Sequence, residues 1–179
     1  VEFALIKAIR SMGLNRGKIG VDSAALMSLF GSADLDSKAL PADDTMKRIR
    51  LIKSPREIQL MRLAATANME AALAAANAAR SGANYRELRA IFFAEAARRG
   101  NRGVFMVIGG VSTDIDHTLR DGDAFLFDAV SEGAGYHGDF ARTVFVGEPS
   151  KTMKQATDAM ALGWATVRDA LRPGMRFSD

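Results

Sequence analysis

Residues 121–149 are DGDAFLFDAVSEGAGYHGDFARTVFVGEP, and they predict two β-strands joined by a tight turn. The apolar run that precedes Asp128 and the aromatic and β-branched residues around Asp139 are both typical of strands. Gly133-Ala134 fits a two-residue type II′ turn, which favours glycine at its first central position. That turn would place Asp128 directly opposite Asp139, with both side chains on the same face of the sheet.

Two carboxylates held this close need a proton or a positive charge between them. Directly opposed side chains in an antiparallel pair have Cβ atoms about 4.5–5.5 Å apart, and like charges there destabilise the sheet. One carboxylate would be protonated, a basic group would lie between the two, or both would bind one cation. Carboxylate oxygens suit a divalent ion such as manganese, cobalt or zinc. A longer turn would shift the register and leave both aspartates in solvent at a strand end, and spacing alone permits that alternative.

Two stretches of the sequence resemble a known superfamily. Ten residues separate Asp128 from Asp139, and the second aspartate lies in the run GYHGDFART at residues 135–143. This pattern resembles the metal-binding hairpin of the creatinase/methionine-aminopeptidase superfamily, and within it Xaa-Pro aminopeptidases and prolidases most. Residues 50–58, RLIKSPREI, resemble the entry to the catalytic domain of prolidase-like members. The resemblance spans approximately residues 46–179.

The resemblance assigns roles to individual residues. It implies that Asp128 and Asp139 are the first two ligands of a centre that holds two divalent metal ions, with Arg142 as a partner of the carboxylates. The register predicted above, rather than the resemblance, places His137 on the same face, opposite Val130, where it is either an outer group near the metals or a half-exposed strand histidine. Family peptidases also have a histidine upstream of the first ligand, near the substrate. The only upstream histidine here is His117, which is several residues too close to Asp128.

The resemblance also implies a reaction. The complete enzyme would be a Xaa-Pro aminopeptidase or dipeptidase that hydrolyses peptides with proline in second position, using a metal-activated water. The family's remaining ligands, one His and two Glu, come from later strands, and the sequence stops at Asp179 before them. We therefore expect this chain alone to bind metal weakly and to be inactive. Two alternatives remain open: a non-catalytic binding module with the same fold, and a creatinase-type hydrolase that needs no metal.

Composition narrows the functions, partners and cellular locations that remain open. The net charge of +3 is too small and too scattered to indicate nucleic-acid binding. No apolar run approaches the roughly 20 residues of a transmembrane helix, so no membrane partner is expected. The absence of cysteine fits a reducing compartment, and with no signal peptide at the start we expect a cytoplasmic protein. The chain begins without Met, as a cut or processed fragment would. Its expected partners are a peptide substrate and either a second copy or the missing C-terminal half.

The rest of the sequence predicts helices around the hairpin. The fold class is α+β, an antiparallel sheet covered by helices. The resemblance specifies this as a partial pita-bread fold preceded by the tail of an α/β N-terminal domain. Residues 1–45 are expected to be a remnant of that domain, with helices at 3–12 and 23–30, a strand at 18–22 and a turn-rich linker at 31–45. Residues 46–179 are expected to be the N-terminal half of the metallopeptidase-like catalytic domain, with a solvated strand edge at 47–53, a buried strand at 104–108 and helices at 54–80, 84–99 and 150–171.

Overall fold

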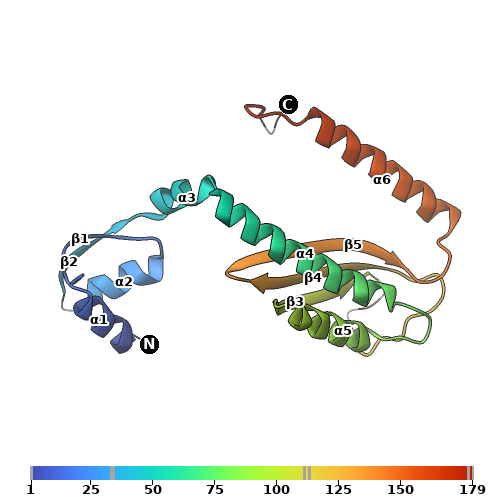
Figure 1. The fold of residues 1–179 in the computed structure, drawn as a ribbon, viewed down its shortest axis with the longest axis horizontal. Coiled ribbons are helices and arrows are strands. Elements are labelled where there is room, and N and C mark those ends of the chain that lie inside the picture. The colour runs from blue at the N-terminus through green and yellow to red at the C-terminus, as the bar shows by residue number, and fades with distance from the viewer. Residues whose placement is uncertain (1, 33–34, 111, 113, 177, 179) are drawn as a thin grey trace. The chain divides into compact units, whose positions relative to one another are not determined.

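The computed structural model describes residues 2–32, 35–110, 112, 114–176 and 178. The chain separates into two compact units, Val1–Glu57 and Ile58–Asp179, whose elements are labelled in Figure 1. The division falls after Glu57, which is later in the chain than the turn-rich segment in which the sequence places the boundary. Helices combined with an antiparallel sheet confirm the predicted α+β class.

The first unit contains a two-stranded parallel sheet with three helices. Its elements are α1 (Glu2–Ser11), β1 (Arg16–Val21), α2 (Ala24–Ser32), β2 (Asp36–Pro41) and α3 (Asp43–Leu51). Strand β1 pairs with β2 so that Arg16 lies opposite Asp36 and Val21 opposite Pro41. Ile9, Val21 and Phe30 are buried together at its centre. The helices predicted at 3–12 and 23–30 and the strand at 18–22 are confirmed.

Two predictions in this unit are wrong. Residues 31–45 contain strand β2 and the beginning of α3 rather than a linker, and residues 47–53 are mostly helical rather than a strand edge. Parallel pairing with β1 is a tertiary contact, which the turn-forming residues of β2 do not reveal. Helix α3 has acidic residues in its first turn and Arg48 and Arg50 in its last, an arrangement that the helix dipole favours.

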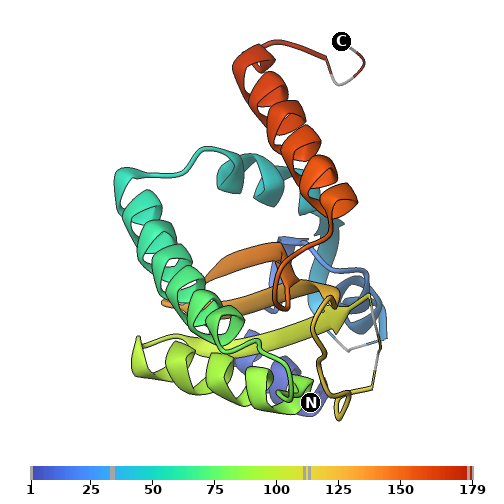
Figure 2. The ribbon, with the colours of Figure 1, turned by 90° about the vertical axis from the view of Figure 1, so that its right-hand side faces the viewer.

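The second unit is built on a three-stranded antiparallel sheet with the order β3-β4-β5. Its elements are β3 (Arg102–Gly109), β4 (Ala124–Gly133), β5 (Tyr136–Phe145) and the helices α4 (Pro55–Asn77), α5 (Tyr85–Arg98) and α6 (Lys151–Ala170). Helices α4 and α5 run along the sheet, and α6 follows the hairpin through a short connection (Figure 2). The three predicted helices of this unit are confirmed.

Side-chain caps fix where these helices begin. The Glu57 amide donates to Ser54 Oγ at 3.3 Å, and the Ser54 amide donates to the Glu57 carboxylate at 2.7 Å, which completes a capping box. The Glu87 amide donates to Asn84 Oδ1 at 2.9 Å at the start of α5, and the Met153 amide donates to Ser150 Oγ at the start of α6. The sequence predicts the first two caps from their Ser/Asn-x-x-Glu spacing.

One face of the sheet forms the core with the helices. Phe125 and Phe127 of β4 are buried with Leu88 and Phe92 of α5. Two buried amides also join α4 to β4: Asn68 Nδ2 donates to the Ala129 carbonyl at 3.0 Å, and Asn101 Nδ2 donates to the Ala64 carbonyl and to Ser131 Oγ. Because buried polar groups are costly unless paired, these bonds favour one seating of α4 on the sheet.

Strand β3 is less buried than the sequence predicts. Met106 is the buried residue of this strand, whereas Val104, Phe105 and Val107 are 37%, 39% and 52% exposed. The strand lies at the edge of the sheet, with β4 on one side only, and helices cover just one of its faces. An apolar run therefore does not imply burial on both faces here.

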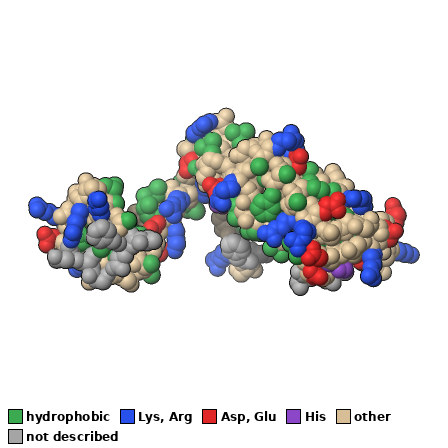
Figure 3. All heavy atoms as spheres, turned by 90° about the horizontal axis from the view of Figure 1, so that it is seen from below, with side chains coloured by type: hydrophobic (Ala, Val, Ile, Leu, Met, Phe, Trp, Pro, Cys, Tyr) green, Lys and Arg blue, Asp and Glu red, His purple; other side chains and the backbone are tan. Residues whose placement is uncertain are grey.

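The charged side chains on the face drawn in Figure 3 are of both signs. None of the helices in the described ranges is both long enough and apolar enough to cross a membrane. Lys and Arg side chains are interspersed with Asp and Glu across the face drawn in Figure 3, rather than gathered into one basic patch. This distribution agrees with the small net charge of +3.

The close approach of α4 to β5 predicts the effect of a single methyl group. A Cβ at Gly138 would lie 2.7 Å from the Ala64 carbonyl oxygen, which is backbone and cannot move aside freely. We expect Gly138→Ala to destabilise the unit by about 2–3 kcal/mol through overpacking. Gly163→Ala is the control, because nothing lies within 4 Å of the added methyl in α6, and it should stabilise by about 0.5–1 kcal/mol. Urea unfolding followed by circular dichroism tests both, and equal midpoints for the two variants would contradict the packing described.

Candidate metal centre

The aspartate hairpin has a different register from the one that the sequence predicts. Asp128 lies opposite Ala141, and Asp139 lies opposite Val130, so the two aspartates are not directly opposed. The central turn residues are Ala134 and Gly135, with φ angles of 52° and 81°. Positive φ at both positions is the signature of a type I′ turn, which matches the twist of the flanking strands. The predicted type II′ turn at Gly133-Ala134 is therefore wrong by one residue.

The register change leaves both aspartates on the same face. Moving the turn by one residue shifts the pairing by two positions, and side chains alternate with a period of two. Asp139 is therefore beside Val130, whose side chain shares a face with that of Asp128. The two aspartates are diagonal neighbours, with a typical separation of about 7–8 Å between such positions. This spacing leaves room for a cation between the carboxylates, whereas direct opposition would press the two charges together.

The surroundings of the two carboxylates are suited to a cation. Asp128 is half-buried and Asp139 is exposed. Across the described part of the chain, neither forms an ion pair with Lys, Arg or His. Among the described residues, therefore, no Lys, Arg or His lies between the two carboxylates as an ion-pair partner. The same residues offer no group of three or more His, Cys, Asp or Glu placed to hold a metal ion, so these two aspartates are a partial donor set.

His137 lies on the predicted face with a different neighbour. It is opposite Glu132 rather than Val130, and it is exposed. Because His137 and Asp139 are two positions apart on one strand, their side chains point to the same side of the sheet. The imidazole is accordingly near the carboxylates without being between them. Glu132 itself pairs with Arg102 of the neighbouring strand.

Arg142 lies on the other face of the sheet. Its cross-strand neighbour is Phe127, which is fully buried against the helices. The guanidinium stacks over the Phe140 ring at 4.7 Å, and Nη1 donates to the Ala141 carbonyl at 2.6 Å. The sequence-based expectation of a contact with the carboxylates does not match this geometry. Three residues separate Asp139 from Arg142, an odd interval, and strand alternation places them on opposite faces.

His117 is not near the aspartates. It lies in the segment between β3 and β4, where its ring centroid is 5.4 Å from that of Tyr85 at the start of α5. His117 Nε2 is 3.6 Å from the Asp123 carboxylate, which is beyond hydrogen-bonding distance. Tyr85 also contacts Phe125 on the helix-covered face. His117 therefore packs with the helices, on the side of the sheet away from Asp128 and Asp139.

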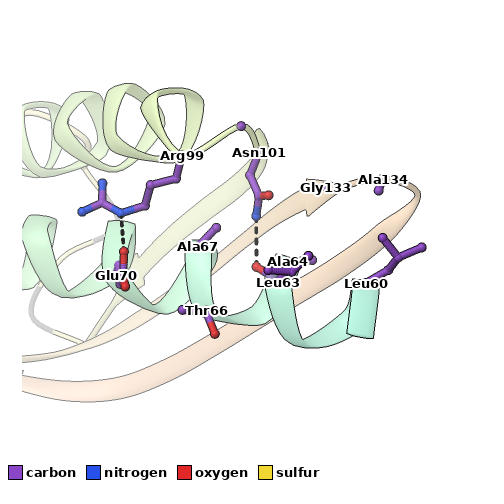
Figure 4. A pocket seen from close by; sticks show the side chains of 11 residues that line it. Leu60, Leu63, Ala64, Thr66, Ala67, Glu70, Arg99, Asn101, Gly133 and Ala134 are labelled. Carbon is purple, nitrogen blue, oxygen red and sulfur yellow. Dashed lines mark hydrogen bonds and ion pairs between the residues drawn. The ribbon is translucent and has the colours of Figure 1, made fainter. Parts of the chain in front are cut away.

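A surface groove beside α4 is a feature that the sequence does not signal. It has a volume of about 460 Å³ and lies between α4, the end of α5 and the hairpin tip (Figure 4). Arg99 and Glu70 form an ion pair of 2.9 Å at one end, and Asn101 donates to the Ala64 carbonyl within it. Glu95 and Glu70 beside Arg99 raise the pKa of its guanidinium. The two charged groups that line this groove, Arg99 and Glu70, are paired with each other.

Comparison with known proteins identifies relatives. Residues 59–179 match the family model of metallopeptidase family M24. The chain is 27% identical over 164 residues to the probable dipeptidase PepE of Mycobacterium bovis, an alignment that covers 86% of this chain and 44% of the relative. It is 28% identical over 154 residues to an uncharacterized peptidase of Bacillus subtilis, covering 78% of this chain and 42% of the relative. The chain thus spans less than half the length of these curated relatives.

Solved structures share the fold. A variant of Escherichia coli aminopeptidase P in complex with substrate has a TM-score of 0.76 at 24% identity, covering 88% of this chain and 41% of that one. Prolidase from Pyrococcus furiosus has a TM-score of 0.68 at 21% identity, covering 80% of this chain and 46% of that one. These matches confirm the predicted partial pita-bread architecture.

Proposed function

Because the chain belongs to metallopeptidase family M24, we propose that Asp128 and Asp139 are the first two ligands of a dinuclear peptidase centre. The remaining ligands would come from outside these 179 residues. The whole protein would be an Xaa-Pro aminopeptidase or dipeptidase that hydrolyses peptides with proline in second position. A cytoplasmic location stays a prediction from the sequence.

The observation that supports this proposal is the pair of carboxylates on one uncovered sheet face. Asp128 and Asp139 share that face as diagonal neighbours, and in the described ranges no cation of the protein neutralises them. Diagonal positions are typically about 7–8 Å apart, which leaves room for a cation between the two carboxylates. A hard or borderline divalent ion is the ligand that two carboxylates accept best, and manganese, cobalt or zinc would satisfy them.

The metals, when bound, would lower the pKa of a shared water and stabilise the oxyanion of the attacked peptide carbonyl. The chain's own contribution is to fix the two carboxylates on rigid, paired strands. His137 shares their face of the sheet, and its proposed role is an outer hydrogen bond to a carboxylate, the kind of contact that orients metal ligands. Arg142 is assigned no part in the proposed centre, because its cross-strand neighbour is Phe127 on the opposite face.

One observation favours the alternative of a non-catalytic binding module. The resemblance implies a substrate-site histidine upstream of Asp128, and His117 packs instead beside Tyr85 on the helix-covered side. A protein that keeps the fold and the aspartates, while lacking that histidine, would bind a peptide more readily than it would cleave it. The creatinase-type alternative needs no metal and gives the two unpaired carboxylates no role.

Manganese titration tests the carboxylate pair. We expect Mn²⁺ to bind weakly and to broaden the NMR signals of residues in the middle of β4 and β5 selectively. Asp128→Asn or Asp139→Asn should weaken this binding by at least about tenfold, because each removes a charged ligand. Asp158→Asn, an exposed aspartate of α6, is the control and should leave binding unchanged.

Two results would contradict this part of the proposal. Broadening that persists in both hairpin variants would place the ion elsewhere. Tight stoichiometric binding by the 179 residues would refute the claim that further ligands are needed.

The uncovered face also predicts association. Phe105, Val107 and Leu126 are 39%, 52% and 47% exposed on the side of the sheet that carries the aspartates. We propose that a second copy, or further chain of the same protein, covers them. Light scattering should give a mass above 19.2 kDa that rises with concentration, and Leu126→Lys should lower it. A stable monomer at all concentrations would count against this surface as a contact.

A further inference from the structure

A small cavity lies beside the edge strand β3. Its volume is about 250 Å³, and its walls come from α5, β3 and the segment that follows β3: Tyr85, Arg89, Met106, Val107, Ile108 and Ile115. Pockets for drug-sized ligands usually measure about 300–1,000 Å³. The size therefore suits a molecule smaller than a drug or a tripeptide.

A buried hydroxyl without an acceptor for its hydrogen is the first sign of a ligand. Tyr85 is 2% exposed, and its Oη donates to no acceptor among the described residues. Leaving a buried donor without an acceptor costs about 1–3 kcal/mol. Burial raises the pKa of Tyr85, the backbone of Ser112 opposes this rise, and Asp123 adds to it. The phenol therefore stays protonated at neutral pH and is available as a donor.

An unpaired cation is the second sign. Arg89 follows Tyr85 by one helical turn, so both side chains project from the same side of α5. The other arginines of this segment are paired: Arg86 with Asp116, and Arg98 and Arg99 with Glu95. Among the residues that the structure describes, Arg89 has no carboxylate within ion-pair distance. Its guanidinium lies 5.5 Å from the centroid of the Phe93 ring.

The remaining walls of the cavity are apolar. Met106, Ile108 and Ile115 contribute thioether and aliphatic side chains, and Met106 is nearly buried. A ligand with only polar groups would make no apolar contact with these walls. A hydrocarbon would give Tyr85 Oη and the guanidinium of Arg89 no acceptor. The chemistry that satisfies both parts is one carboxylate attached to a short apolar body.

We propose that this cavity binds a small monocarboxylate with a branched or otherwise compact apolar body, whose carboxylate accepts hydrogen bonds from Arg89 and Tyr85. The site is independent of the aspartate pair. Met106 lies opposite Ala129, on the helix-covered face, whereas Asp128 and Asp139 are on the other face. Val107, which also lines the cavity, is the cross-strand neighbour of Asp128, but neither Arg89 nor Tyr85 belongs to the hairpin that carries the aspartates.

Fluorine NMR on the full 179-residue chain provides the test. The chain has two tyrosines, so 3-fluorotyrosine labelling gives two signals, with Tyr136 in the hairpin as the internal reference. Isocaproate is the probe, and isocaproamide is its uncharged counterpart. We expect isocaproate to shift the Tyr85 signal saturably, with a Kd in the millimolar range or tighter, and the amide to bind about tenfold more weakly.

Variants of two arginines on the same helix test whether the charge of Arg89 causes the preference for isocaproate over isocaproamide. Arg89→Gln should abolish the preference for the carboxylate over the amide, and Arg89→Lys should keep part of it. Arg98→Gln, which removes an exposed arginine at the other end of α5, should behave as the unmodified chain does.

The inference is overturned by any of three outcomes. These are equal binding of acid and amide, an equal loss in Arg89→Gln and Arg98→Gln, and a Tyr85 signal that does not saturate up to tens of millimolar probe. The same titration with Asp128→Asn should match the unmodified chain. Failure of the carboxylate-binding proposal can then be distinguished from failure of the metal-site proposal.

Discussion

The pairing of β4 with β5 divides the chain's polar residues between two faces of one sheet. Side chains along each strand alternate, so a residue's face follows from whether its distance from Asp128 along the pairing is odd or even. Asp128, Asp139 and His137 share the uncovered face, and Arg142 is on the face that meets the helices. The metal role proposed for the two aspartates depends on this single constraint.

The helices set which face stays open. Helix α4 approaches the sheet through small residues, with Ala64, Ala71 and Ala75 buried, and Gly138 allows its backbone to lie close to β5. The Asn68 amide then bonds to the β4 backbone. A helix seated this closely covers much of one face, and the aspartates are on the other. The unit thus separates a packed side, which includes the cavity of Tyr85 and Arg89, from a side where a metal could bind.

Much of the fold and part of the site could be predicted from the sequence, for identifiable reasons. Caps such as Asn84 and the alternation around Asp128 are local signals, and they gave the helices of the second unit and the shared face of the aspartates. The predicted register was wrong because Ala134 adopts a positive φ. An alanine side chain disfavours that conformation, but the twist of the hairpin imposes it. Strand β2 and the unburied side of β3 depend on neighbours distant in sequence. Likewise, the hydroxyl of Tyr85 becomes buried without an acceptor only when α5 packs beside β3.

Cadmium binding by paired cysteines tests the central claim most directly, because the natural chain contains no cysteine. If the two aspartates share a face, an Asp128→Cys/Asp139→Cys chain should bind one Cd²⁺ through both thiolates and show the ultraviolet charge-transfer band of cadmium–thiolate bonds. An Asp128→Cys/Phe140→Cys chain, whose cysteines would lie on opposite faces, should show no such intramolecular site. Equal cadmium binding by the two chains, or binding by the second alone, would contradict the shared face on which the metal centre depends.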